Sequence, residues 1–157
     1  MIVFRLSKAD FARDLSGKGA EKSGGRWNSK GVALLYTSDS RALCTTEIAV
    51  HTPLGILPTN YVIIAIEIPD GSSTKELLAT SLPHDWRSYP HSYSTQEIGN
   101  NFVKISNCLV LKVPSAIVQG EFNYLINPRH KDFKKIKIIS VDSFNFDERL
   151  FLKSGLK

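Results

Sequence analysis

The chain has 157 residues, of which 42% are hydrophobic and 22% are charged, as is typical of one globular domain with its own core. This composition excludes an intrinsically disordered chain, and the longest apolar run, residues 61–68, is too short to span a bilayer. We therefore expect a soluble, cytoplasmic protein without a membrane partner. The formal net charge of +5 permits attraction to anionic partners but is too mild to identify one.

Apolar patterning and clusters of turn-forming residues predict short strands separated by short helices. The expected strands span residues 2–6, 32–37, 60–69, 108–113 and 136–141, followed by a last extended segment at 144–151. The expected helices run from Ser7 to near Gly17, from Ser38 or Asp39 to about His51, and from Ser94 to about Ser106. Ser7 with Asp10, and Ser94 with Glu97, form candidate capping boxes.

The segments between these elements are expected to be irregular. Residues 18–23 read as a polar loop suited to act as a lid, and residues 81–93 as a long aromatic loop of the kind that lines sites. Residues 75–79 are ambiguous, and Asn127 with Pro128 predicts a turn. This irregular order predicts an α+β single domain over residues 1–157, with a mixed or antiparallel sheet rather than a doubly wound one.

Residues that bind metals or form disulfides are few and scattered. Cys44 and Cys108 each lie in an apolar segment, which predicts two buried free thiols rather than a disulfide. The four histidines lack the paired spacing of zinc ligands, and no glycine-rich phosphate loop follows a strand. We therefore expect neither a metal nor a Rossmann-type nucleotide site.

The stretch from residue 24 to residue 51 gathers the polar residues that best fit a site. Gly24 and Gly25 allow a sharp turn, so that Arg26 projects from a loop and is placed to hold an anion. Tyr36 lies near the end of a predicted strand. On the following helix, the neighbours of Glu47 three and four positions away include no lysine or arginine. A carboxylate without a local ion pair needs a partner or a ligand elsewhere, which makes Glu47 the leading catalytic candidate.

Six segments together resemble the RES domain, the toxin component of bacterial RES–Xre type II toxin–antitoxin modules. They are GGRWNSKGVALLYTS, TEIAVH, LPHDWR, TQEIGNNF, VPSAIVQGEFNYLINPRH and FNFDERL, in the order of the family. The family is named for an arginine, a glutamate and a serine, which match Arg26, Glu47 and Ser115, with Tyr36 as a fourth pocket residue. The resemblance implies a fold similar to diphtheria-toxin-like ADP-ribosyltransferases, NAD as the substrate and an Xre-type antitoxin as the partner. Nucleic acid would then be contacted only through the antitoxin.

The resemblance also implies roles that the residue types support. Cleavage of the nicotinamide–ribose bond develops positive charge on the sugar, which Glu47 would stabilise, or Glu47 would hold a ribose hydroxyl. Arg26 would grip the pyrophosphate through bidentate hydrogen bonds. Tyr36 would stack on a flat ring such as nicotinamide, and Ser115 would offer its hydroxyl to ribose or phosphate.

Several alternatives stay open at this point. The acceptor of ADP-ribose would be water, phosphate or a protein, the last making the chain an ADP-ribosyltransferase. A non-enzymatic module is the third reading, in which the basic run at residues 129–137 binds RNA or a protein, although a solvated edge explains that run equally. Arg5 would face the pocket or pair with a nearby carboxylate. Without the resemblance, the four site residues would be read as ordinary surface, core or turn residues.

Overall fold

A computed structural model describes residues 1–152, in which seven strands form one sheet in the order β4-β5-β6-β2-β1-β3-β7. The strands are β1 (Ile2–Lys8), β2 (Leu35–Ser38), β3 (Tyr61–Glu67), β4 (Thr74–Glu76), β5 (Val110–Pro114), β6 (Phe122–Ile126) and β7 (Lys137–Phe144). The pairing of β4 with β5 is parallel, and the other pairings described are antiparallel. The mixed sheet confirms the predicted α+β class. Residues 153–157 of the expected domain lie outside the described residues.

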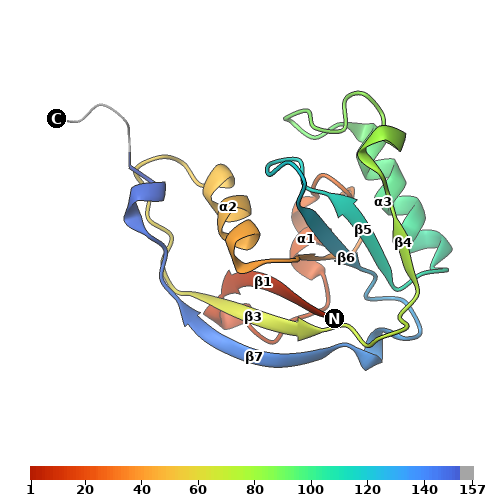
Figure 1. The fold of residues 1–157 in the computed structure, drawn as a ribbon, viewed down its shortest axis with the longest axis horizontal. Coiled ribbons are helices and arrows are strands. Elements are labelled where there is room, and N and C mark those ends of the chain that lie inside the picture. Colours follow the sequence, from red (N-terminus) through yellow and green to blue (C-terminus); the bar gives the residue numbers. More distant parts are fainter. Residues whose placement is uncertain (153–157) are drawn as a thin grey trace.

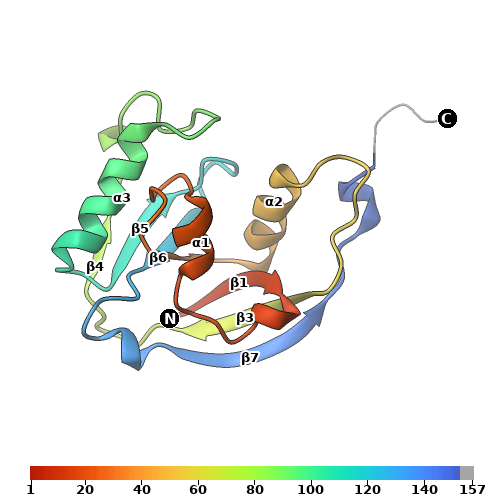
Figure 2. The same ribbon diagram turned by 180° about the vertical axis from the view of Figure 1, so that it is seen from behind.

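Three α-helices accompany the sheet: α1 (Lys18–Ser23), α2 (Arg41–His51) and α3 (Tyr93–Ile105). Helix α2 packs against β1 and β2, whereas α3 lies beside β4, β5 and β6 at the other end of the molecule (Figure 1). From behind, α1 lies in front of β6 (Figure 2). Within residues 1–152, no helix has the length and hydropathy needed to cross a bilayer.

The sheet is weakly joined where β1 meets β2. These strands share a single register pair, Phe4 with Ser38, whereas β1 pairs with β3 at seven positions. Leu35–Ser38 instead pairs along its whole length with β6. Because β1 and β2 diverge, the two halves of the sheet separate beside α2. The side chains that project there line an open space instead of packing against one another.

The N-terminal elements differ from the prediction. Ser7 does not open a helix, because β1 continues to Lys8 in register with β3, and a 3-10 turn follows at Ala9–Phe11. The predicted loop at residues 18–23 is helix α1, whose first turn closes when the Glu21 amide donates to the Gly17 carbonyl at 3.0 Å. Tertiary strand pairing and a local helical hydrogen bond thus overrode the capping and polarity signals on which the predictions relied.

Both longer helices exist, but their caps are shifted. Ser40, rather than Ser38 or Asp39, caps α2, because its hydroxyl accepts from the Leu43 amide at 3.0 Å. Helix α3 begins at Tyr93 rather than Ser94, whose hydroxyl instead donates to the Asp85 carboxylate at 2.9 Å. That contact ties the start of α3 to the aromatic loop before it.

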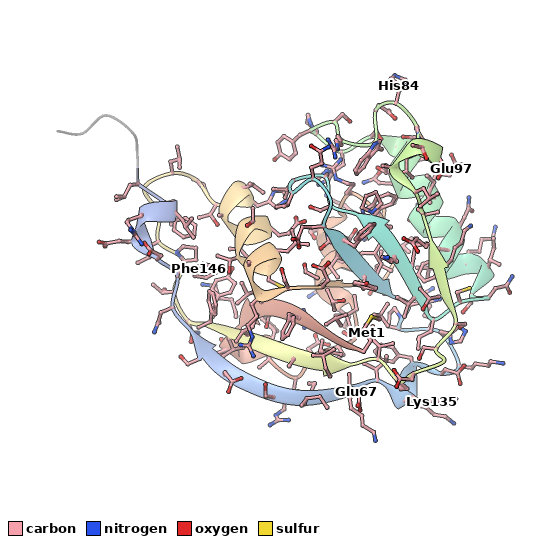
Figure 3. All side chains as sticks on the ribbon, viewed as in Figure 1. Met1, Glu67, His84, Glu97, Lys135 and Phe146 are labelled. Carbon is pink, nitrogen blue, oxygen red and sulfur yellow. The ribbon has the colours of Figure 1, made fainter. Side chains whose placement is uncertain are left out.

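Each of the five predicted apolar segments contains a strand, but some strand ends differ from the prediction and two further strands are present. Strand β2 begins three residues later than predicted, β6 was not predicted, and the ambiguous segment at residues 75–79 contributes to edge strand β4. The predicted extended segment at 144–151 is not a continuous strand, since β7 ends at Phe144 and a 3-10 turn follows at Glu148–Leu150. The rings of Phe146 and Phe151 pack edge to face at 5.5 Å. Phe146 is labelled at the end of the molecule opposite α3 in Figure 3.

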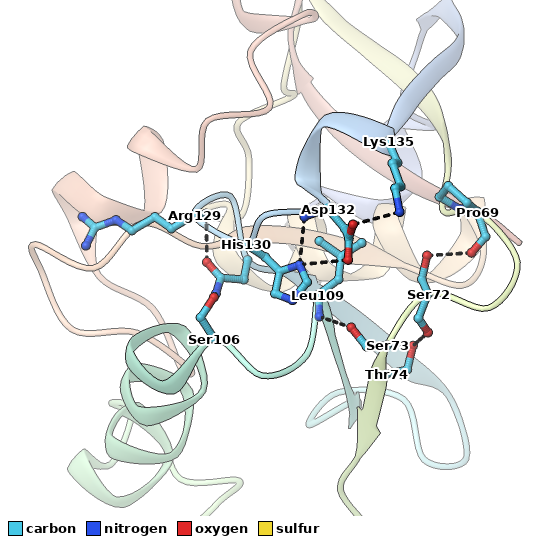
Figure 4. A network of polar contacts seen from close by, with 11 residues as sticks. Pro69, Ser72, Ser73, Thr74, Ser106, Leu109, Arg129, His130, Asp132 and Lys135 are labelled. Atoms are coloured by element: carbon cyan, nitrogen blue, oxygen red, sulfur yellow. Dashed lines mark hydrogen bonds and ion pairs between the residues drawn. The ribbon is translucent and has the colours of Figure 1, made fainter.

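The basic run begins in a hydrogen-bonded turn and becomes exposed further along. The predicted turn is present, since the His130 amide donates to the Asn127 carbonyl at 3.2 Å. His130 is buried and its Nδ1 accepts from the Asp132 amide, while Lys135 pairs with the Asp132 carboxylate at 2.8 Å (Figure 4). The lysines of the run, at positions 131, 134, 135 and 137, are exposed, as expected of a solvated edge.

Helix α3 approaches the loop after α1 at a glycine. A Cβ atom at Gly99 would lie 2.7 Å from the carbonyl carbon of Trp27 and closer still to its oxygen. Trp27 is buried in a cluster with Trp86, Phe102 and Leu125. The missing side chain of Gly99 therefore allows α3 to rest directly on the backbone that follows Arg26.

We predict that Gly99→Ala destabilises the protein by about 1–3 kcal/mol, because the added methyl overlaps backbone atoms that have no room to move. Thermal unfolding measures the effect. The matched control is Gly19→Ala in α1, where a Cβ would meet nothing within 4 Å. That substitution is expected to be neutral or to stabilise by up to about 1 kcal/mol, since alanine favours helix. Equal unfolding temperatures for the two variants would contradict the packing argument.

Candidate active site

A cleft of about 680 Å³ opens beside the junction of β1 and β2. Its walls come from both strands, from α1 and α2, and from the loops at residues 24–27 and 87–91. Three of the four predicted site residues, Arg26, Tyr36 and Glu47, line it. Ser115 lies outside this lining. Arg5 also lines the cleft, and its Nη1 donates to the Asp14 carbonyl at 2.7 Å.

Arg26 reaches from its loop to the aromatic loop across the cleft. Its Nη1 donates to the carbonyl oxygens of Trp86 at 2.6 Å and Ser88 at 3.0 Å. Burial lowers the pKa of Arg26, while the nearby Glu47 carboxylate acts in the opposite direction. The guanidinium stays protonated, because arginine does not lose its proton in proteins. Among residues 1–152 its hydrogen bonds use Nη1, which leaves Nε and Nη2 as a two-pronged donor for an anion.

The loop that carries Arg26 is fastened by the hydroxyl of Tyr36. That hydroxyl accepts from the Trp27 amide at 3.0 Å and donates to the Asn28 side-chain oxygen at 2.7 Å. Burial raises the pKa of Tyr36, so the group remains a neutral donor at physiological pH. The tyrosine thus lines the cleft while its polar end is engaged with the loop.

Glu47 is held from behind by one of its two oxygens. Oε1 accepts from Asn123 Nδ2 at 2.8 Å and from the Ser115 hydroxyl at 3.4 Å. Asn123 is oriented in turn by Ser38, whose hydroxyl donates to the Asn123 oxygen at 2.7 Å. The carboxylate is half-buried, and no salt bridge to it occurs among the described residues. Oε2 therefore remains for a group in the cleft.

Ser115 lies behind Glu47 and is 1% exposed. Its hydroxyl accepts from the amides of Ile117 at 3.1 Å and Val118 at 3.0 Å, besides donating to the carboxylate. This arrangement makes it a turn residue that also orients Glu47. Its predicted contact with ribose or phosphate stays a prediction.

Sequence reasoning missed Asn123. This residue stands on β6, which was not predicted, and meets Glu47 because β6 pairs with β2 in the register that sets Asn123 opposite Ser38. No local pattern marks an asparagine for such a role. The motif segment that contains it was the available signal, but the segment did not single it out.

Aromatic rings gather at the mouth of the cleft. The rings of His51, Tyr89 and His91 lie 5.6 to 6.3 Å apart, on α2 and on the aromatic loop. Burial lowers the pKa of His91, and the charge of Arg26 lowers it further. The lowered pKa favours the neutral form of His91, and the three rings offer an aromatic surface to the ring of a ligand.

One of the two cysteines, Cys44, lines the cleft. Cys44 is free and buried, and burial raises its pKa to about 11, so it is a protonated core residue. Cys108 is also free but only half-buried. Within residues 1–152, no three histidine, cysteine or carboxylate side chains are grouped as metal ligands.

Comparisons with known proteins identify the family of the chain. The family model of the RES domain matches residues 2–147. The "Prs ADP-ribosylating toxin" of Sphingobium sp. strain YBL2 is 41% identical over 145 residues, covering 91% of this chain and 90% of the relative. A "Toxin Res" of Photorhabdus laumondii is 36% identical over 152 residues, covering 96% and 97%.

A solved structure shows the same fold at lower identity. It is the Mycobacterium tuberculosis MbcT–MbcA toxin–antitoxin complex, with a TM-score of 0.69 and 19% identity, covering 96% of this chain and 86% of the other. At that identity the likeness concerns the fold alone. The family match and the identity to relatives over nearly their whole length establish more: the chain belongs to the RES domain family of toxins.

Proposed function

We propose that the chain consumes NAD, by breaking the bond between nicotinamide and ribose. The observation that carries the proposal is the pairing, in one cleft, of a carboxylate held by one oxygen with a guanidinium that keeps two nitrogens for an anion. Glu47 supplies the first group and Arg26 the second. The aromatic rings of His51, Tyr89 and His91 beside them fit the flat rings of a dinucleotide.

The chemistry follows from where charge develops. Nicotinamide leaves with the electron pair of the bond to ribose, and the sugar takes up positive charge before the acceptor attacks. Oε2 of Glu47 stabilises that charge or holds a ribose hydroxyl, because Asn123 and Ser115 fix the other oxygen. Nε and Nη2 of Arg26 bind the pyrophosphate, and the ring of Tyr36 forms part of the wall beside it. The proposed binding residues are Arg26 and Tyr36. Ser115 orients Glu47, and its own contact with ribose or phosphate stays a prediction.

The acceptor distinguishes two candidate activities. With water or phosphate the chain depletes NAD by hydrolysis or phosphorolysis. With a protein acceptor it is an ADP-ribosyltransferase, and the name of the relative with 41% identity, an ADP-ribosylating toxin, favours this second activity. In either case we propose action in the cytoplasm and neutralisation by an Xre-type antitoxin. The toxin–antitoxin complex named for the structure with the same fold supports a protein partner.

The first experiment follows the products of NAD incubated with purified, antitoxin-free protein, with and without phosphate and cell extract. Free ADP-ribose would identify hydrolysis, and its phosphorylated form phosphorolysis. Transfer of label to a protein, with nicotinamide released only when extract is present, would identify the transferase. Absence of nicotinamide under all conditions would contradict the proposed function and favour a non-enzymatic module.

Glu47→Gln is expected to lower kcat on the order of 100- to 1,000-fold, because it removes a fixed negative charge from the developing cation while keeping the shape of the side chain. Nicotinamide release measures the change, and thermal unfolding checks that the fold is retained. Glu97→Gln on α3 is the matched control, since Glu97 is exposed at the outer edge of the molecule (Figure 3). Turnover by Glu47→Gln at the rate of the control would refute the catalytic role.

Arg26→Lys is expected to raise KM for NAD about tenfold or more with a smaller change in kcat. Lysine keeps the charge but cannot donate two parallel hydrogen bonds to a pyrophosphate. Initial rates over a range of NAD concentrations separate the two constants. The control is Arg13→Lys, at an exposed position outside the cleft. An unchanged KM in Arg26→Lys would argue against the pyrophosphate contact.

A further inference from the structure

The loop that carries Arg26 is a tight turn with its middle buried. A bridge joins Gly25 to Asn28, and the Gly25 amide donates to the Asn28 carbonyl at 2.9 Å. Trp27 is 3% exposed and Asn28 is fully buried. Arg26 therefore lies between Gly25, whose amide is hydrogen-bonded within the turn, and Trp27, which is buried in the core. The position of its guanidinium depends on how firmly the backbone on both sides is held.

Helix α3 holds the two ends of this turn from outside. Gln96 Nε2 donates to the Gly25 carbonyl at 3.0 Å, and Asn100 Oδ1 accepts from the Ser29 amide at 3.0 Å. Between them, Gly99 lets the helix rest on Trp27. These contacts fix where the turn begins and ends. They do not engage the Trp27 amide, the backbone donor next to Arg26.

That amide is engaged from the inner side by a closed hydrogen-bond network. Tyr36 accepts from the Trp27 amide and donates to Asn28, whose Nδ2 donates to the carbonyls of Ala20 at 2.8 Å and Val32 at 3.0 Å. The Trp27 amide, the Tyr36 hydroxyl and both ends of the buried Asn28 side chain therefore all have hydrogen-bond partners. Loss of the phenol oxygen would leave the Trp27 amide and the Asn28 oxygen without partners, which is unfavourable away from water.

We propose that Tyr36 is a positioning residue, whose hydroxyl locks the turn at residues 25–28 and so holds Arg26 where it meets the anionic groups of the substrate. The inference rests on the proposed function for the identity of that substrate. It assigns Asn28 to the site as the partner that completes the lock. It also differs from ring stacking by Tyr36, because stacking requires the ring and not the hydroxyl.

Tyr36→Phe separates the two roles, since phenylalanine keeps the ring and loses only the oxygen. NAD affinity is measured by calorimetry in the Glu47→Gln background, where the substrate is expected to be consumed far more slowly. We expect Tyr36→Phe to weaken binding about tenfold, as Arg26 loses its fixed position. The matched control is Tyr93→Phe, an exposed tyrosine outside the cleft, with unchanged affinity. Affinity of Tyr36→Phe equal to that of this control would overturn the proposal.

A double-mutant cycle tests whether Tyr36 acts through Arg26. In an Arg26→Ala background the lock has no guanidinium to position, so Tyr36→Phe is expected to cause no further loss of NAD affinity. An additional tenfold loss in that background would mean that Tyr36 affects NAD affinity independently of Arg26, by direct contact or through the fold as a whole, and would overturn the proposal.

A readout without substrate keeps the lock testable on its own. Amide hydrogen exchange of Trp27 is expected to be at least about tenfold faster in Tyr36→Phe than in Tyr93→Phe, while amides of β3 exchange at equal rates in both. Unchanged exchange at Trp27 would refute the lock. If exchange rises as expected while NAD fails to bind the protein with native Tyr36, the lock stands and the proposed function fails.

Discussion

Strand β2 presents two hydroxyl groups on one face, and the cleft depends on what they hold. Residues two apart on a strand point to the same side, so Tyr36 and Ser38 act together. Tyr36 engages the turn that carries Arg26, and Ser38 orients Asn123, which holds Glu47. A four-residue strand thus sets the positions of both charged groups. The loop arginine and the helical carboxylate are thus both positioned through hydrogen bonds to side chains of this one strand.

The weak junction between β1 and β2 explains why a cleft exists at this place. A fully paired sheet would bring the two strands together and close the space, as β1 and β3 do on the other side. Here α2 packs on the diverging pair, and the loops at residues 24–27 and 87–91 complete the walls. The site is half-open, with buried hydrogen bonds behind the polar groups and exposed aromatic rings at its mouth. Such an arrangement combines fixed charges with access for a large ligand.

Prediction succeeded where the signal was local or ordered along the chain. The apolar runs of β3 and β5, the helix that carries Glu47 and the loop that carries Arg26 were found because each has a pattern within a few residues. It failed at α1, at the end of β1 and at β6, where pairing with distant strands or a close helical turn decided the conformation. It also did not anticipate that the Tyr36 hydroxyl has partners in the turn, while stacking of the Tyr36 ring on a ligand stays a prediction.

By itself, the sequence determined the family, the mixed α+β class and the residues with the right chemistry: an arginine in a glycine-rich loop and a glutamate without a local cation. The tertiary structure alone decided that these two groups face one cleft and that Asn123, 76 positions from Glu47, holds the carboxylate. The physical reason is one of range. Side-chain type and spacing are local properties of the chain, but a hydrogen bond between distant residues depends on strand register, which the whole core sets.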